Sequence, residues 1–291
     1  INNMAGQLKE VRNRIKSTQG TQQITKAMKM VSAAKLRRAQ ESIIKMRPYL
    51  KNMQQILANI VANDNDLKNM PFMAKRPINH VLLIVVTSDR GLCGGYNTNI
   101  IKLAKSVIQQ KYPTQQITIW NVGKKGYESL TKSGFNTDAS FKDIFLNLQY
   151  KEVNKMAQKA IQLFLEKKID AVEIIYSEFK NAALQKYTAE SFLPIHFENQ
   201  SSNSKHNFMF EPDKESLVLS LIPSALSAQV FKAILDAQAS EHGARMTAMD
   251  KASENAAELL KSLKISYNRA RQAAITTELT EIVSGAAALN G

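Results

Sequence analysis

The chain has 291 residues, of which 44% are hydrophobic and 22% charged, and its formal net charge is +14. This composition is ordinary for a soluble protein of one or two domains, and apolar runs such as HVLLIVV at 80–86 are far too short to span a bilayer. The single cysteine, Cys93, excludes an internal disulfide and a thiolate zinc cage, and fits a reducing compartment.

The positive charge is concentrated at the start of the chain. Residues 1–62 contain 12 Lys or Arg and 2 Asp or Glu, a net charge of +10, whereas residues 212–291 have a net charge of −1. A basic first segment predicts an acidic partner, whether a polynucleotide, an anionic lipid surface or an acidic protein. Nucleic acid is disfavoured, because no aromatic residue precedes Tyr49 to stack on bases and the basic residues are scattered rather than continuous.

Residues 3–62 read as one long helix, about 90 Å long at ~1.5 Å per residue. Apolar residues recur there at alternating steps of three and four, which is the pattern of one helix packed along another. This seam contains Leu36, Ala39, Ile43, Met46, Leu50, Met53, Leu57 and Ile60, with Leu8, Val11 and Ile15 in the same phase nearer the start. Pro48 lies within the pattern and predicts a kink or a local break.

The seam changes character between residues 18 and 34. In strict phase it would fall on the polar residues Thr18, Gln22, Thr25, Lys29 and Ser32, whereas the apolar Ile24, Met28 and Val31 lie on a rotated face. We therefore expect the packing stripe to shift here. One interpretation is a stutter within a helix pair, and the other is that this stretch also faces a second partner; both can hold.

The middle of the chain begins with residues 62–77, which are polar, contain two prolines and predict a linker. Strands are expected at 80–87, 117–122, 171–179 and, running back as an edge strand, at 184–192, with helices at 97–111 and 153–167 and a short helix after Gly123. This alternation predicts a small parallel α/β sheet with right-handed crossovers.

The turn after the first strand invites a catalytic interpretation, because Gly91, Gly94 and Gly95 stand where phosphate-binding folds hold their ligand. The sequence GLCGGY is neither a dinucleotide fingerprint nor a P-loop, so a tight turn that needs glycine is the simpler interpretation. The histidines are scattered, no H-E-x-x-H occurs, and Asp89 and Arg90 have no identifiable partner for acid–base work. These residues identify no catalytic group, no cofactor site and no metal site.

The last segment is dominated by helix formers. Pro212 and Pro223 flank the expected entry, and one helix from Ser224 to Leu289 would be about 100 Å long, twice the ~50 Å diameter of a compact globule of this chain length. A ridge of small residues is expected at Ala244, Ala248, Ala252 and Ala256, followed by an apolar face through Leu259, Leu263, Ala270, Ala273, Ile275, Leu279 and Ile282. A helix of this length must pack against another helix or another protein.

Three blocks of sequence point to a known family. They are IKSTQGTQQITKAMKMVSAAKLRRAQ near the start, TSDRGLCGGYN in the middle, and SEHGARMTAMDKASENA with RQAAITTELTEIVSGAAAL at the end. They resemble the gamma subunits of rotary proton-translocating ATP synthases, in their bacterial form, over essentially the whole chain. The cysteine-bearing insert of chloroplast gamma subunits is missing, so no control by thiol oxidation is expected.

The resemblance implies an α/β protein with long helices: an antiparallel coiled coil of the two terminal helices plus a central Rossmann-like domain. We expect the first helix at 1–62, the linker at 63–77, the α/β domain at 78–211 and the last helix at 212–291. The implied function is that of the central shaft, which couples rotation of the membrane c-ring to the catalytic beta subunits and holds no catalytic site. The implied partners are the hexamer of three alpha and three beta subunits, the epsilon subunit and the c-ring, at the cytoplasmic face of the bacterial inner membrane.

The resemblance also implies which residues contact the hexamer. Thr25, Lys26, Met28 and Lys29 match the block that faces acidic lever loops of beta; Arg245, Arg271 and Gln272 match the C-terminal contact block; and Cys93 matches a loop near the coiled coil and the levers. Exposed ion pairs of this kind, worth at most ~1 kcal/mol each, can exchange during rotation.

Two other functions stay open on the residues alone. One is a helical scaffold that binds nucleic acid or an acidic protein through its basic arm. The other is a small nucleotide-binding α/β enzyme with helical extensions.

Overall fold

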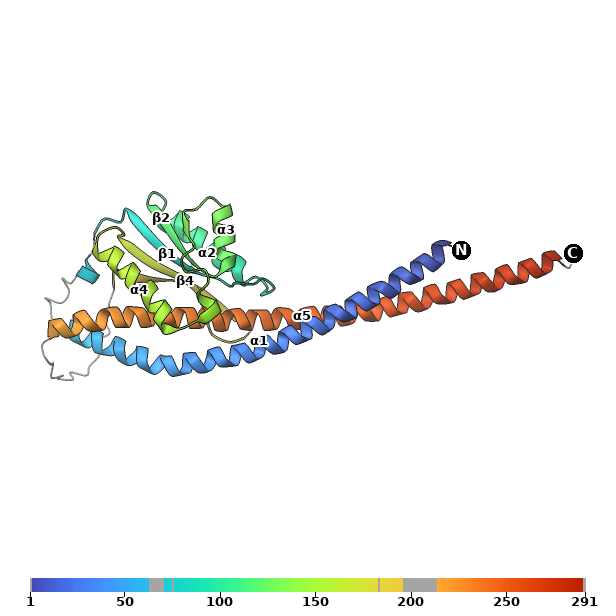
Figure 1. Ribbon diagram of the computed structural model, residues 1–291, viewed down its shortest axis with the longest axis horizontal. Coiled ribbons are helices and arrows are strands. Elements are labelled where there is room, and N and C mark those ends of the chain that lie inside the picture. The colour runs from blue at the N-terminus through green and yellow to red at the C-terminus, as the bar shows by residue number, and fades with distance from the viewer. Residues whose placement is uncertain (1, 63–70, 75, 183, 196–213, 290–291) are drawn as a thin grey trace. The chain divides into compact units, whose positions relative to one another are not determined.

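The computed structural model of this chain describes residues 2–62, 71–74, 76–182, 184–195 and 214–289 (Figure 1). The elements are, in chain order, α1 (Asn2–Ala62), η2 (Pro71–Met73), β1 (His80–Val86), α2 (Tyr96–Lys111), β2 (Gln116–Val122), α3 (Lys124–Lys132), β3 (Thr137–Asp138), η3 (Ile144–Asn147), α4 (Tyr150–Leu165), β4 (Ala171–Phe179), β5 (Gln185–Leu193) and α5 (Lys214–Leu289). Most of the linker predicted at 63–77 lies outside the described residues.

The chain divides into two compact units. Residues Ile1–Val31 and Met246–Gly291 form one, which we call the helix-pair unit, and residues Ser32–Arg245 form the other, the sheet unit. Because α1 and α5 are each continuous across a boundary, each of them contributes to both units.

The sheet unit contains five strands in the order β3-β2-β1-β4-β5. β1 lies parallel to β2 and to β4, β2 lies parallel to β3, and β5 runs antiparallel to β4. The predicted parallel sheet with a returning edge strand is therefore confirmed. The two-residue β3 was not predicted, because Thr137 and Asp138 carry no apolar signal.

Each face of the sheet is covered by helices. Leu82, Ile84 and Val86 of β1 join a core with α4, with residues 218–237 of α5 and with Leu57 of α1. The intervening residues of β1 point to the other face, where α2 and α3 supply the packing. This two-sided burial explains why β1 reads as an uninterrupted apolar run rather than an alternating one.

Two prolines lie inside helices. Pro223, which was expected at the entry to the last helix, lies inside α5, which begins at Lys214. At Pro48, where a kink or a local break was expected, α1 continues without a break. At Pro223 the helix continues because its buried neighbours, among them Ile222 and Leu226, pack on the sheet. Tertiary burial there outweighs the missing backbone donor, and Ser227 donates a hydrogen bond to the Pro223 carbonyl at 2.8 Å.

One described helix is apolar enough to be tested as a membrane span. Within Val218–Ala287 of α5, an 18-residue window has a mean hydropathy of 1.6. Half of that window is buried inside the fold, as in the core helix of a globular protein, so length and composition are weak evidence for a span.

The predicted seam of α1 is confirmed in the sheet unit. The seam residues from Leu36 to Leu57 are buried or half-buried, with exposures of 3–6% for Leu36, Ala39, Ile43, Leu50 and Leu57.

The face predicted for the end of α5 is partly wrong. Leu259 and Ala273 are exposed, whereas Leu260 is buried and Leu263 half-buried. In the helix-pair unit the residues turned inward are Met249, Ser253, Ala256, Leu260, Leu263, Tyr267, Ala270, Ala274 and Thr277. These positions alternate steps of four and three, as a coiled-coil seam requires. Apolar residues occur on both faces here, so the sequence pattern could not identify the packed one.

Candidate functional site

The predicted contact block on α1 lies in the helix-pair unit, where polar groups join the two helices. The hydroxyl oxygens of Thr25 and Ser253 are 2.7 Å apart, and both residues are buried. Lys29 Nζ lies 2.5 Å from Asp250 Oδ1, with both side chains somewhat less than half exposed. Gln22 donates from Nε2 to the Ser253 carbonyl at 3.5 Å. We call these contacts the polar seam.

The predicted shift of the packing stripe is wrong. The strict-phase residues Thr25 and Ser32 are 8% and 3% exposed, whereas the apolar Ile24 and Val31 are 62% and 56% exposed. The helix pair keeps its phase because hydroxyl and charged groups on α5 satisfy the polar residues of α1. The seam therefore has no stutter, and the apolar face points away from α5. This arrangement favours the alternative that the stretch faces a second partner.

The second contact block centres on Arg245, at the end of the sheet unit. Its guanidinium lies 2.5 Å from Glu241 Oε1 through Nη1, and Nη2 donates to the carbonyls of Arg90 and Gly91 at 3.0 and 3.3 Å. Arg90 and Gly91 belong to the glycine turn, which we define as residues 88–95. One buried side chain of α5 therefore holds the turn that follows β1.

Burial controls the titration of the groups around Arg245. It raises the pKa of Glu241 above the usual carboxyl value, although the Arg245 charge opposes this rise. Burial lowers the pKa of His242 to about 4, and the charges of Arg245 and Lys35 lower it further. His242 is therefore neutral at physiological pH. Glu241 and Arg245 form a pair shielded from water rather than a surface contact.

Side-chain hydrogen bonds hold the glycine turn around Cys93. The Asn97 side chain accepts a hydrogen bond from the Ser88 backbone N–H at 3.0 Å and donates one to Cys93 Sγ at 3.3 Å. Cys93 is 2% exposed, and Gly94 has a φ of +59°, which favours glycine. Leu92 is also left-handed and is 66% exposed. The thiol is packed, and the outward-facing side chain of this turn, Leu92, is apolar.

α5 crosses the place where open α/β sheets bind ligands. In this sheet the connections leave β1 and β4 in opposite directions, and ligands of such folds bind at the carboxyl ends of those strands. Here Tyr96 at the start of α2 donates from its hydroxyl to the Ala237 carbonyl at 3.0 Å, and Ser240 donates to the Ser177 carbonyl at 3.0 Å. These contacts place residues 237–245 of α5 over the carboxyl ends of β1 and β4.

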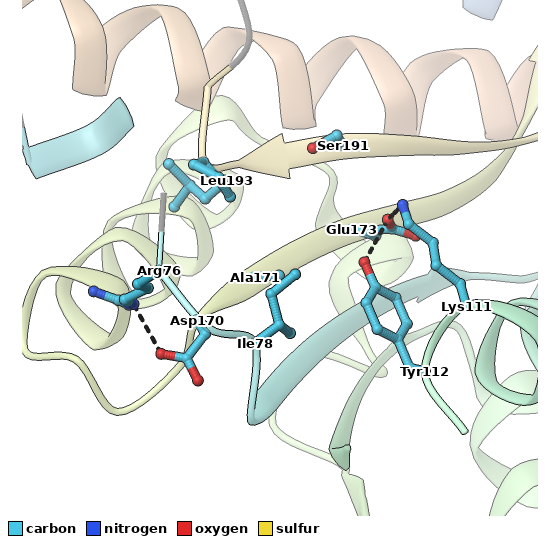
Figure 2. Close-up of a pocket in the computed structure, with 10 residues that line it drawn as sticks. Arg76, Ile78, Lys111, Tyr112, Asp170, Ala171, Glu173, Ser191 and Leu193 are labelled. Atoms are coloured by element: carbon cyan, nitrogen blue, oxygen red, sulfur yellow. Dashed lines mark hydrogen bonds and ion pairs between the residues drawn. The ribbon is translucent and has the colours of Figure 1, made fainter. Parts of the chain in front are cut away.

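A pocket of about 320 Å³ lies at the opposite edge, where β1 and β4 begin (Figure 2). Arg76 Nε lies 2.8 Å from Asp170 Oδ1, and Asp170 Oδ2 accepts from the backbone of Asn79 and His80 at 2.9 and 3.0 Å.

The other polar wall of this pocket is Glu173, which is 3% exposed. It is contacted by Lys111 Nζ and accepts a hydrogen bond from the Tyr112 hydroxyl at 2.8 Å. Burial and this hydrogen bond raise the pKa of Tyr112. Both carboxylates of the pocket thus contact donors that belong to the sheet unit. These contacts connect α2 and β1 to β4.

The predicted contact residues fall into three groups. Lys26, Arg271 and Gln272 are exposed. Thr25 and Lys29 belong to the polar seam, and Met28 is half-buried on the same stretch of α1. Cys93 and Arg245 are buried in the sheet unit and are joined through the glycine turn.

Sequence reasoning missed three partners of these residues, Glu241, Asp250 and Ser253, and it also missed Tyr267, which accepts a hydrogen bond from Arg12. Glu241 could have been found, because it stands four residues before Arg245 on a predicted helix. The other three could not, because the register of two helices is not readable from one sequence. Among the described residues, no group of three or more His, Cys, Asp or Glu could hold a metal ion.

Comparison with known proteins identifies relatives over the full chain. A family model described as ATP synthase matches residues 7–289. The ATP synthase gamma chain of Cytophaga hutchinsonii is 49% identical over 291 residues, which cover 97% of this chain and 99% of that relative. The gamma chain of Flavobacterium johnsoniae is 46% identical over 285 residues, with coverages of 98% and 99%.

Solved structures share the fold. One chain of the Euglena gracilis mitochondrial ATP synthase, in a structure of OSCP, F1 and c-ring, matches with a TM-score of 0.65 and 21% identity, covering 98% of this chain and 95% of that one. A chain from the central stalk and c-ring of the Tetrahymena thermophila mitochondrial enzyme matches with a TM-score of 0.57 and 22% identity, covering 79% and 99%. At these identities the likeness concerns the fold alone.

Proposed function

The chain belongs to the family of ATP synthase gamma chains and has the central-stalk role in that enzyme, and we propose that it turns inside a hexamer of three alpha and three beta subunits. Rotation driven by the c-ring would be carried along α1 and α5 to the catalytic beta subunits, and ATP hydrolysis would drive it in reverse. The structures of rotor assemblies that share the fold support this proposal.

The observation that carries the proposal is the outward apolar face of α1 in the helix-pair unit. Ile24 and Val31 are 62% and 56% exposed, on a stretch of α1 whose inward residues Thr25 and Ser32 are polar. A helix pair that packed only on itself would be expected to bury these side chains and expose the hydroxyls. The arrangement suits a rod whose outer surface meets another protein.

The roles of the predicted contact residues follow from their exposure. We propose that Lys26, Arg271 and Gln272 touch the hexamer directly. Arg245 and Cys93 would act through the glycine turn, since their own side chains are buried and Leu92 of that turn is exposed.

Of the remaining three, Thr25 and Lys29 belong to the polar seam, and Met28 is half-buried on the same stretch of α1. Their part in the contact with the beta levers is also a proposal. Lys29 combines both roles, because it is paired with Asp250 and still partly exposed.

We further propose that the chain has no catalytic site and that nucleotide chemistry belongs to the beta subunits. α5 covers the carboxyl ends of β1 and β4, so a nucleotide would have to displace residues that hydrogen-bond to Tyr96 and Ser177. Micromolar nucleotide binding by the purified chain would instead favour the enzyme alternative. Tight, steeply salt-dependent binding of duplex DNA would favour the nucleic-acid scaffold.

The finer assignments of partner and place belong to the same proposal. They are the epsilon subunit and the c-ring as partners of the sheet unit, the cytoplasmic face of the bacterial inner membrane as location, and the division at 1–62, 63–77, 78–211 and 212–291. Support comes from the bacterial gamma chains and from the rotor assemblies to which the chain is similar.

The decisive experiment places a charge on the outer face. In the assembled complex, Ile24→Asp and Val31→Asp should leave subunit composition unchanged but lower ATP-driven proton pumping severalfold more than ATP hydrolysis. The control is Asn52→Asp, an equal charge change at an exposed position of α1 in the sheet unit. An unchanged ratio of pumping to hydrolysis in both test variants would reject the outer face as the coupling surface.

A further inference from the structure

Three polar pairs join the two helices of the helix-pair unit. Arg12 Nη2 donates to the Tyr267 hydroxyl at 3.0 Å, and its guanidinium lies 5.8 Å from the ring centre. The other two are the Thr25–Ser253 hydroxyl pair and the Lys29–Asp250 ion pair. From Arg12 to Lys29 the chain advances seventeen residues, and from Tyr267 to Asp250 it retreats seventeen, so the pairs mark one common antiparallel register.

One of the two alternating positions of the apolar seam of α1 does not distinguish that register from its neighbours. In the sheet unit Leu36, Ile43, Leu50 and Leu57 are all buried and stand seven residues apart. If α1 slid by one heptad, about 10.5 Å at ~1.5 Å per residue, each aliphatic side chain would take the place of the next. α1 is unbroken from Asn2 to Ala62, so such a slip would carry the whole helix with it.

The polar pairs do distinguish the registers. A slip of seven residues in either direction would place Thr25 opposite Leu260 or Met246 instead of Ser253. The same slips would place Lys29 opposite Ala257 or Gly243, and would place Arg12 opposite Ala274 or Leu260. All three pairs are lost together, and buried hydroxyls are left against apolar side chains, which is unfavourable.

We propose that the polar seam determines the register of α1 against α5, with Thr25–Ser253 and Lys29–Asp250 as the specificity-determining pairs. Polar residues in an otherwise apolar seam select one alignment at some cost in stability, and this is their best attested use in helix pairs. The alignment fixes which residues of α1 and α5 stand at the same level of the rod. The inference concerns the chain alone, so it can fail or hold independently of the proposed contacts with the hexamer.

The test measures one distance along the rod in the purified full-length chain. Nitroxide labels at Gln19 and Lys261, both exposed, report the alignment in a Cys93→Ser background by pulsed electron spin resonance. The test variant makes the seam apolar with Thr25→Val, Ser253→Ala, Lys29→Met and Asp250→Ala. We expect a second distance population, reflecting a shift of about 10 Å along the axis, to grow at least tenfold over the parent.

Two matched variants separate register from general polarity. Thr21→Val with Ser262→Ala removes two exposed hydroxyls that bond only to their own helices, and it should keep a single population. Exchanging the pairs, with Thr25→Ser and Ser253→Thr together with Lys29→Asp and Asp250→Lys, should also keep one register.

A single unchanged distance in the apolar variant would overturn the proposal, and so would equal slippage in the exchanged variant. If circular dichroism shows that the apolar variant does not fold, the label pair is measured in Asp250→Lys, which opposes two lysines in the native register. That variant must also show the second population, and a single native distance would overturn the proposal equally.

Discussion

Two pairs of glutamate and arginine, each spaced by four residues on a helix, show how differently the two units treat the same motif. In the helix-pair unit Glu10 and Arg14 are 2.8 Å apart, and their side chains are 62% and 67% exposed. In the sheet unit Glu241 and Arg245 are 2.5 Å apart, and both side chains are 10% exposed. The spacing of four residues brings each pair together, but burial by the surrounding residues decides whether the pair stabilises the fold.

The same contrast runs along α5. Between residues 226 and 245 nearly every side chain is buried or half-buried, because the sheet, the glycine turn and the β4–β5 turn surround the helix. Beyond Met246 most side chains are exposed, apart from one narrow seam. One continuous helix is thus packed on nearly all sides in the sheet unit and mostly exposed in the helix-pair unit.

The largest contrast is expected from removing the arginine of each pair. Arg245→Ala leaves the buried Glu241 without its cation and the Arg90 and Gly91 carbonyls without their donor, so the free energy of unfolding should fall by about 3–5 kcal/mol. Arg14→Ala should change it by less than ~1 kcal/mol. Urea denaturation of both full-length variants provides the measurement. Equal losses would mean that the sheet unit does not depend on its buried pair.

Glycines offer the next comparison. A Cβ on Gly243 would lie 3.2 Å from the backbone of Ala182, so Gly243→Val should destabilise the protein by about 2 kcal/mol through overpacking. A Cβ on Gly20 in the helix-pair unit would meet no atom from outside its own stretch of helix within 4 Å, and Gly20→Val should be neutral or slightly stabilising. Thermal unfolding compares them. A harmless Gly243→Val would show that the β4–β5 turn can move away from α5.

The third prediction concerns pH. Burial raises the pKa of Asp236 to about 6 from 3.8; the charges of Lys232 and Arg47 oppose the rise, whereas Glu178 and Glu190 add to it. Between pH 4 and 6 the folded state binds the proton that the unfolded state releases, so stability falls as pH rises through this range.

Asp236→Asn removes that charge and should stabilise the protein by roughly 1–3 kcal/mol at pH 8, with the gain vanishing below pH 4. Unfolding free energies measured from pH 4 to 8 test this. Glu254 is exposed in the helix-pair unit, so Glu254→Gln should change the free energy of unfolding by less than ~0.5 kcal/mol at every pH from 4 to 8. A pH-independent effect of Asp236→Asn would assign it to packing rather than to charge.

The smallest effect is expected within the helix-pair unit itself. Ala256 is 8% exposed in the seam, so Ala256→Leu should overpack it and destabilise the chain by about 1–2 kcal/mol. Its neighbour Ala257 is exposed, and Ala257→Leu should be close to neutral. Thermal melting distinguishes them, and identical midpoints would indicate that this part of the rod has no fixed packing.

Prediction from the sequence succeeded where the pattern within one element is enough to identify its buried residues. Apolar runs predicted the strands at 80–87, 117–122 and 171–179, and heptad spacing predicted the seam of α1 from Leu36 to Leu57. Prediction failed where the inward face of a helix depends on a partner helix that is distant in the sequence. The inward face of α5 was assigned to Leu259 instead of Leu260, and residues 18–34 of α1 were expected to turn their apolar side inward.

The sequence alone determined that this protein has two very long helices around a small α/β sheet, because periodicity and the absence of proline beyond Pro223 act locally. It also determined the family, because three blocks spread over the whole chain carry the resemblance. Only the tertiary structure decided that Thr25 and Lys29 face α5, that Arg245 holds the glycine turn, and that α5 covers the crevice of the sheet. Each of these depends on the hydrogen-bonding group that a distant residue supplies, and no local pattern encodes that group.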